Sequence, residues 1–196
     1  MTPAEITAAT TRCLSAGDGT LKKNRHGELQ VRYAMVQAAV GYPVDGTPQP
    51  VLLLEDSGGY FDCSRTNAEI WVGKSGDHFT VDRNAAGFEL PTISGGTSNP
   101  CNSPTAPTIH SAVALKTYPG TAAARLTLRT REGTRTANVP TRNGYVYLNI
   151  QISGTSVSRP TEMTVELLGD TGEPLRIQPY ARPVTTKLEY TLDPCS

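Results

Sequence analysis

The first apolar positions of the chain recur at helical spacing. Between residues 3 and 16 the apolar side chains share one face, which holds Ile6, Ala9, Cys13 and Leu14. Thr2 and Glu5 match a capping box, and Pro3 suits the first helical position. Gly17 follows as a common helix stop. The pattern predicts a short helix over residues 3–16, with its cysteine directed at the structure on which the helix packs.

Apolar runs separated by turn residues replace the helical pattern after residue 28. Residues 51–54 are a continuous apolar run that ends at a turn over residues 56–59, and another turn is predicted at 74–77. Runs of this kind are typical of strands that a core covers. We predict strands in this half of the chain at residues 28–40, 51–54, 60–63, 68–73 and 78–82.

Residues 91–108 interrupt this pattern. They contain four prolines and two glycines among small polar residues, so they are the clearest linker candidate. Beyond them Leu126 and Leu128 alternate with Thr127 and Arg129, as in a strand with one buried face. Turn signals stand at residues 132–133, 143–144 and 170–172. We predict strands at residues 109–117, 124–131, 135–139, 145–152, 162–168 and 175–179.

Together these elements predict an α+β protein that is mostly β. Residues 1–90 form a subdomain with the N-terminal helix and a small antiparallel sheet. Residues 91–108 are the Pro/Gly/Ser-rich linker, and residues 109–196 form an antiparallel β-sandwich. The 196-residue chain is long enough for a sizeable core. The first subdomain either packs on the sandwich or shares its core.

Four cysteines stand far apart in the chain, at positions 13, 63, 101 and 195. Metal sites and redox motifs need clustered sulfurs, so an even and scattered set favours structural disulfides and an oxidising compartment. Of the three possible connectivities we prefer Cys13–Cys63, which ties the helix to the first sheet, with Cys101–Cys195, which fixes the linker to the C-terminal tail. The alternative is a reduced protein with four free thiols.

Charge and hydropathy exclude several classes of function. Lys plus Arg and Asp plus Glu both number 18, so the chain lacks the basic excess of a protein that binds nucleic acid or acidic membranes. No stretch approaches the roughly 20 apolar residues of a membrane span. The N-terminus also lacks the signals of a secretory leader. We therefore expect an exported domain without its leader, whose membrane anchor, if it has one, lies outside this chain.

Two short motifs have a plain structural explanation. The Gly-Lys-Ser sequence at 73–75 copies the end of a phosphate-binding loop, but Ala68 stands where the first glycine of that loop belongs. The Asp-Thr-Gly sequence at 170–172 copies the aspartic-protease signature, which needs a second such aspartate that this chain does not contain. Both sequences are predicted to be turns between strands.

The histidines form no recognisable catalytic or metal constellation. His26, His78 and His110 stand apart, without HxH or HxxxH spacing, so we predict no metal and no cofactor. Asp77-His78 and His110-Ser111 supply the residue types of a serine triad, yet no strained nucleophile turn accompanies them. No catalytic residue is assigned. A secreted hydrolase of unrecognised type is the alternative, and these four residues are the first to inspect for it.

The last third of the chain carries a resemblance to known proteins. The segments concerned are Arg125–Gly133, Asn143–Val146, Met163–Val165 and Asp170–Leu175. They resemble C-terminal β-domains in the extracytoplasmic parts of actinobacterial membrane-anchored proteins, some of them linked to regulatory systems. The preference for Arg over Lys and the abundance of Ala, Gly, Pro and Thr agree with a GC-rich bacterial genome. The resemblance implies a location outside the membrane and no catalytic residues.

The sequence therefore predicts a non-catalytic extracytoplasmic domain that binds or senses a ligand. It would belong to a bacterial, specifically actinobacterial, surface or membrane-anchored protein. Its partner would be a protein or a small molecule, and not a nucleic acid. Besides the hydrolase, the other alternative is a purely structural wall-associated protein, which would lack an apolar concave pocket.

Overall fold

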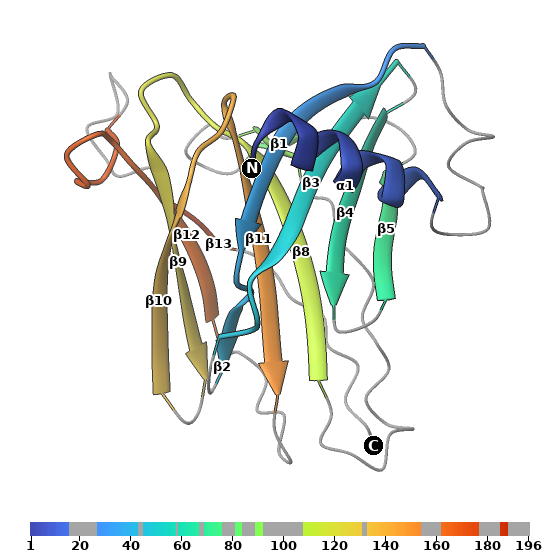
Figure 1. The fold of residues 1–196 in the computed structure, drawn as a ribbon. Coiled ribbons are helices and arrows are strands. Elements are labelled where there is room, and N and C mark those ends of the chain that lie inside the picture. The colour runs from blue at the N-terminus through green and yellow to red at the C-terminus, as the bar shows by residue number, and fades with distance from the viewer. Residues whose placement is uncertain are drawn as a thin grey trace.

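The computed structural model of the chain is built mainly from β-strands, with a single α-helix in its described part (Figure 1). The predicted mostly-β composition with an N-terminal helix is confirmed. The structure describes residues 1–15, 27–42, 45–57, 59–66, 69–75, 81–83, 89–91, 108–130, 133–153, 162–176 and 185–187.

The helix α1 (Pro3–Ser15) begins with the predicted capping box. The Thr2 N–H donates to the Glu5 carboxylate at 2.6 Å, and the Glu5 N–H donates to the Thr2 hydroxyl at 3.3 Å. The hydrogen bonds from Thr2 lower the pKa of the Glu5 carboxyl. Within the helix only Ala9 and Cys13 are buried. The helix is thus held on the sheet below by a narrow apolar stripe.

The sheet below α1, here called the helix-side sheet, has β3 in an inner position. Its antiparallel strands lie in the order β1 (Gln30–Gln37), β3 (Gln49–Asp56), β4 (Gly59–Thr66) and β5 (Glu69–Ser75). Leu52 and Leu54 of β3 pack with the buried residues of α1, whereas Val51 and Leu53 belong to a second cluster on the other face. Because both faces of β3 are covered, its sequence is a continuous apolar run.

The middle sheet consists of β2 (Val40–Tyr42), β11 (Tyr145–Ser153) and β8 (Thr108–Lys116), in that order. β8 is antiparallel to β11, and β2 is parallel to it. Every residue from Tyr145 to Ile150 is buried. Val146, Leu148 and Ile150 pack on one side of the sheet, and Tyr145 and Tyr147 pack on the other. The middle sheet is therefore covered on both faces.

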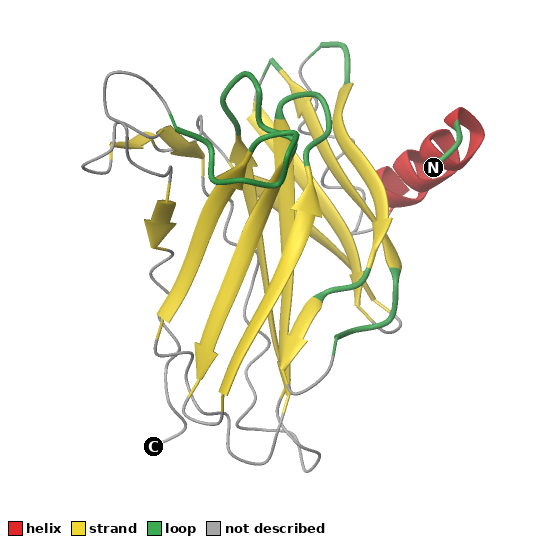
Figure 2. Cartoon of the chain, turned by 90° about the vertical axis from the view of Figure 1, so that its left-hand side faces the viewer, coloured by secondary structure: helices red, strands yellow, loops and turns green. Residues whose placement is uncertain are grey.

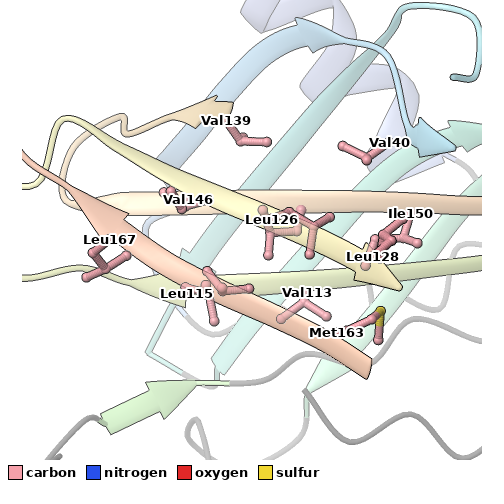
Figure 3. Packing of buried hydrophobic residues seen from close by; sticks show 13 residues of the cluster. Val40, Val113, Leu115, Leu126, Leu128, Val139, Val146, Ile150, Met163 and Leu167 are labelled. Atoms are coloured by element: carbon pink, nitrogen blue, oxygen red, sulfur yellow. The ribbon is translucent and has the colours of Figure 1, made fainter. Parts of the chain in front are cut away.

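The outer sheet has one buried and one polar face. Its antiparallel strands lie in the order β10 (Gly133–Pro140), β9 (Ala123–Thr130), β12 (Glu162–Leu168) and β13 (Thr185–Lys187). The predicted alternation in β9 is confirmed, because Leu126 and Leu128 are buried in the cluster shared with the middle sheet (Figure 3). On the opposite face Arg125 pairs with Glu166 of β12 at 2.9 Å.

The layers therefore follow the order α1, helix-side sheet, middle sheet and outer sheet. Figures 1 and 2 show α1 on the far side of the helix-side sheet, away from the other sheets. A further strand pair, β6 (Val81–Arg83) with β7 (Glu89–Pro91), adjoins β8. One apolar cluster fills each interface, and each buried Leu or Val side chain in it contributes about 1.5–3 kcal/mol.

Most predicted strands are present, and the differences lie in short pieces. The predicted connection over residues 41–50 contains most of β2, which was not expected as a strand. The strands β7, whose Pro91 was predicted to begin the linker, and β13 were not expected either. Only the beginning of the predicted strand at residues 175–179 is described. Pro174, just before it, forms an isolated bridge with Leu168. The sequence Lys74–Ser75, predicted as part of a turn, belongs to the end of β5.

Several contacts cross the predicted subdomain border. β2, from residues 1–90, pairs with β11, and Tyr33 of β1 stacks on Tyr147 with 6.2 Å between ring centroids. These contacts correspond to the second of the two predicted arrangements, in which residues 1–90 share the core of residues 109–196. The division at the linker stays a prediction, because residues 92–107 lie outside the described part of the chain.

A disulfide between Cys13 and Cys63 joins α1 to β4. The two Cα atoms are 6.0 Å apart, and both side chains are buried beside Leu52 and Leu54. A helix of 13 residues is marginally stable in isolation, so this covalent link supplements the narrow apolar stripe. Cys101 and Cys195, the other preferred pair, lie outside the described residues.

Replacing Cys13 and Cys63 by serine is expected to lower the free energy of unfolding by about 4 kcal/mol. The reason is that the disulfide closes a loop across 50 positions of the unfolded chain. Urea unfolding followed by circular dichroism measures the change. Ala8→Ser on the exposed face of α1 is the matched control, with an expected change of about 0.5 kcal/mol or less. A double variant as stable as this control would contradict the proposed stabilising role.

Candidate functional site

The described loops at one end of the sheets are joined by backbone hydrogen bonds. We call this region the loop end, and its loops are residues 117–122, 141–144 and 169–175 (Figure 2). The Thr117 N–H donates to the Gly144 carbonyl at 2.8 Å. The Ala122 N–H donates to Leu168 at 2.8 Å, and the Ala122 carbonyl accepts from Thr141 at 2.9 Å. Loops fixed on a β-scaffold in this way are where binding residues concentrate.

The loop between β10 and β11 is the tight Asn-Gly turn that the sequence predicts. Asn143 and Gly144 have φ values of 51° and 77°, and Arg142 and Tyr145 exchange two backbone hydrogen bonds of 2.8 Å. Two successive residues with positive φ are typical of a type I′ turn. The turn carries the chain from the outer sheet to the middle sheet and presents Arg142 to solvent.

The Asp-Thr-Gly sequence is also a tight turn, as predicted. The Gly169 N–H donates to the Glu173 carbonyl, and the Gly172 N–H donates to the Gly169 carbonyl, both at 2.9 Å. Gly172 has a φ of 79°, which favours glycine. Asp170 is exposed at the tip of this loop. Its surroundings are those of a loop residue on the surface and not those of a shared carboxylate pair.

A β-bulge in β1 directs Arg32 toward the middle sheet. Val31 pairs with Leu54 and Tyr33 pairs with Leu53, so Arg32 is the extra residue of the strand. The bulge changes the alternation: Val31 packs toward α1, whereas the Arg32 guanidinium forms an ion pair with Glu55. The hydrogen bond to Glu55 raises the pKa of Arg32. Both side chains are partly exposed, at 36% and 24%.

Tyr60 and Tyr145 connect this ion pair to the middle sheet. Their hydroxyls are 3.2 Å apart, and their ring centroids are separated by 6.3 Å. Burial raises the pKa of Tyr60 well above that of an ordinary phenol, and hydrogen bonds with Tyr145 and Glu55 raise it further. We call Arg32, Glu55, Tyr60 and Tyr145 the inter-sheet cluster. It links the helix-side and middle sheets through polar groups next to the loop end.

Tyr33 lies deeper between the same two sheets. Its hydroxyl donates to the Gln37 side-chain oxygen at 2.9 Å and lies 3.4 Å from the Pro140 carbonyl. The Gln37 amide donates to the Tyr147 carbonyl at 2.8 Å. Burial raises the pKa of Tyr33 to about 12, while nearby Arg142 acts in the opposite direction. These contacts give the inter-sheet cluster a rigid support.

Two further cations flank Tyr145. Lys116 is the register partner of Tyr145 on β8, and Arg142 lies three residues before it in the turn. Directly paired residues of an antiparallel sheet place their side chains on the same face, so Lys116 extends from the face that bears Tyr145. Lys116 and Arg142 are both exposed. Among the described residues, neither side chain has an ion-pair or hydrogen-bond partner.

The loop end can therefore offer charged and hydroxyl groups to a ligand on a rigid support. Within the described residues, no group of three or more His, Cys, Asp and Glu side chains is placed to hold a metal ion. In the same part of the chain, no helix combines the length and apolar content needed to cross a membrane. The described chemistry of this site is that of hydrogen bonding and charge attraction.

The residues singled out for a hydrolase are not brought together by anything in the described chain. Asp77 and His78 lie outside the described residues, as does His26. His110 and Ser111 belong to β8, where they are the register partners of Gln151 and Ile150. The hydrolase alternative thus stays a hypothesis.

Sequence reasoning missed the inter-sheet cluster. Its members come from four strands, and Tyr60 and Tyr145 are 85 positions apart in the chain. No motif of neighbouring residues predicts a cluster of this kind. One usable signal was present: a tyrosine in an otherwise apolar strand normally finds a partner for its hydroxyl when it is buried, and Tyr145 and Tyr147 fit this description.

Tyr60→Phe is expected to lower the free energy of unfolding by about 1–2 kcal/mol at neutral pH, because Glu55 and Tyr145 lose a hydrogen-bond partner. The variant should also change the alkaline pH dependence. Because the folded-state pKa of Tyr60 is raised above the ordinary tyrosine value of about 10, its stabilisation is complete below about pH 10 and declines above it.

The decline with rising pH should accordingly be shallower in Tyr60→Phe than in the wild type. Urea unfolding between neutral pH and about pH 12 measures it, with Thr136→Ala on the exposed β10 as control. Identical pH profiles for Tyr60→Phe and the wild type would contradict the role of the Tyr60 hydroxyl.

No protein-family model, curated protein or solved structure matches this chain significantly. The resemblance to extracytoplasmic actinobacterial β-domains therefore stays a hypothesis that rests on the residues quoted for it.

Proposed function

We propose that this chain is a non-catalytic extracytoplasmic domain that binds its ligand at the loop end. The observation that carries the binding role is the loop end itself, where fixed loops adjoin the inter-sheet cluster and the exposed cations Lys116 and Arg142. Because backbone hydrogen bonds already fix these loops, their backbone loses little further entropy when a ligand binds. Such a site suits recognition without requiring any reaction.

The disulfide supports the extracytoplasmic location. Disulfides persist in oxidising compartments and are rare in reduced ones, and the Cys13–Cys63 bond lies among buried apolar side chains. The domain would be part of a surface or membrane-anchored protein of a bacterium, specifically an actinobacterium. Its ligand would be a protein or a small molecule of the cell exterior.

The fold proposal accompanies this function. Residues 109–196 would form an antiparallel β-sandwich, with the outer sheet and the β8–β11 part of the middle sheet as its two halves. The shared apolar cluster of Leu126, Leu128, Leu148 and their neighbours supports this assignment. In β-sandwich proteins, loops gathered at one end of the two sheets commonly form the binding surface.

A matched pair of blocked variants tests the binding role. Thr171→Cys lies in an exposed loop of the loop end, and Thr136→Cys lies on the exposed face of β10. Each added thiol is coupled to a maleimide-linked polyethylene glycol chain. The oxidised proteins are then immobilised and exposed to an actinobacterial cell-envelope extract. We expect the unmodified domain and the blocked Thr136→Cys variant to retain the same envelope component.

The blocked Thr171→Cys variant should retain none of it, because the polymer covers the loop end. Circular dichroism and thermal unfolding serve as controls for the fold of both variants. Equal retention by both blocked variants would show that the loop end is not the binding surface. Absence of any specific retention by the unmodified domain would contradict the binding function as a whole.

A further inference from the structure

The surface of the loop end around Tyr145 is flanked by exposed cations. Lys116 and Arg142 stand on either side of this residue, one on the neighbouring strand and one in the preceding turn. Arg32 approaches from the helix-side sheet, and its charge acts on both Tyr145 and Tyr60. Three cations from three separate elements thus lie near Tyr145.

The acidic side chains described near this surface form no ion pair with Lys116 or Arg142. Glu55 is already engaged by Arg32 and by Tyr60. Glu28, which is exposed, lies two residues before Gln30, the register partner of Glu55. The acidic residues Asp170 and Glu173 belong to the loop that follows β12, on the side of the outer sheet. In the described part of the chain, neither Lys116 nor Arg142 is neutralised by an ion pair.

The phenols beside the cations are already hydrogen-bonded. The Tyr60 hydroxyl donates to the Glu55 carboxylate and accepts from the Tyr145 hydroxyl at 3.2 Å, so both phenol protons are engaged. Because the pKa of Tyr60 is raised, its hydroxyl keeps its proton at physiological pH and brings no negative charge. An anion would therefore meet the positive charges of Lys116 and Arg142 without meeting a phenolate.

We infer that the loop end binds an anionic group, a carboxylate or a phosphate, between Lys116 and Arg142, which flank Tyr145. Hydrogen bonds between ionised partners are stronger than those between neutral ones, and a guanidinium can hold either kind of anion through two N–H groups. The inference rests on the proposed binding function and specifies its ligand class. The small number of cations suits a single anionic group and not an extended polyanion.

The turn geometry strengthens the position of Arg142. The type I′ turn fixes the backbone on both sides of the Asn-Gly pair through two hydrogen bonds of 2.8 Å. The Thr117 N–H, next to Lys116, donates to the Gly144 carbonyl of the same turn. The backbones that carry the two cations are therefore hydrogen-bonded to each other, so their separation is set before a ligand arrives.

Titration calorimetry with two separate probes tests the inference. Citrate represents carboxylates and inorganic phosphate represents phosphates, and the two titrations distinguish these sources of the anion. The proteins are the oxidised wild type, the double variant Lys116→Gln/Arg142→Gln, and Arg129→Gln. Arg129 is an exposed cation of β9 on the outer sheet, so its substitution removes one charge away from the proposed site.

We expect at least one probe to bind the wild type, with an affinity that falls as salt is added. The double variant should bind at least about tenfold more weakly, because it loses two charge-assisted contacts. Arg129→Gln should bind within about twofold of the wild type, since a distant exposed charge is screened. Thermal unfolding checks that each variant is folded.

Two results would overturn the inference. One is that neither probe binds the wild type. The other is that Arg129→Gln weakens binding as much as the double variant, which would indicate general charge attraction. If the loop end retains its envelope component while both probes fail, the ligand class is wrong and the binding function stands. If retention fails as well, the proposed function fails with it.

Discussion

Burial of the middle sheet on both faces is the constraint on which the rest of this structure depends. Leu148 and its neighbours on one face complete the core with the outer sheet, and Tyr147 on the other face completes the core with the helix-side sheet. On the face that meets the middle sheet, the described residues of each flanking sheet pack against the middle sheet alone. Because the strands of the middle sheet contribute to both cores, the two halves of the chain stabilise each other.

The polar contacts between layers follow from this arrangement. A tyrosine between two sheets buries its ring and must find a partner for its hydroxyl, since an unpaired buried hydroxyl costs about 1–3 kcal/mol. Tyr33 meets this need with Gln37, and Tyr60 meets it with Tyr145 and Glu55. The bulge at Arg32 then brings a cation to the edge of the same interface. The candidate site is thus a consequence of how the layers are joined.

Local patterns predicted the elements well and their partners less well. The alternation in β9 and the Asn-Gly turn could be predicted because each depends only on residues that are close in the sequence. β2 was missed because three residues without a strong pattern pair with a strand more than a hundred positions later. Its place is fixed by tertiary contacts: Asp45 accepts a hydrogen bond from the Gly41 N–H at 2.9 Å and pairs with Arg135 of β10.

Predicting the site would have required knowing the register of the helix-side and middle sheets. No sequence pattern indicates the bulge that directs Arg32. The placement of Lys116 beside Tyr145 depends on the pairing of β8 with β11. The disulfide needed less information. Cys13 lies on the apolar face of a recognisable helix and Cys63 lies in a strand beside the core, and the structure joins these two residues.

Native-state hydrogen exchange tests the central claim most directly. If the middle sheet is the shared core, the backbone amides of Val146, Leu148 and Ile150 exchange only through global unfolding, and the slowest amides of β3 and β9 exchange with the same free energy. Exchange in two separate cooperative steps, one for the helix-side sheet and one for the outer sheet with β11, would contradict it. That result would indicate two independent subdomains that merely touch.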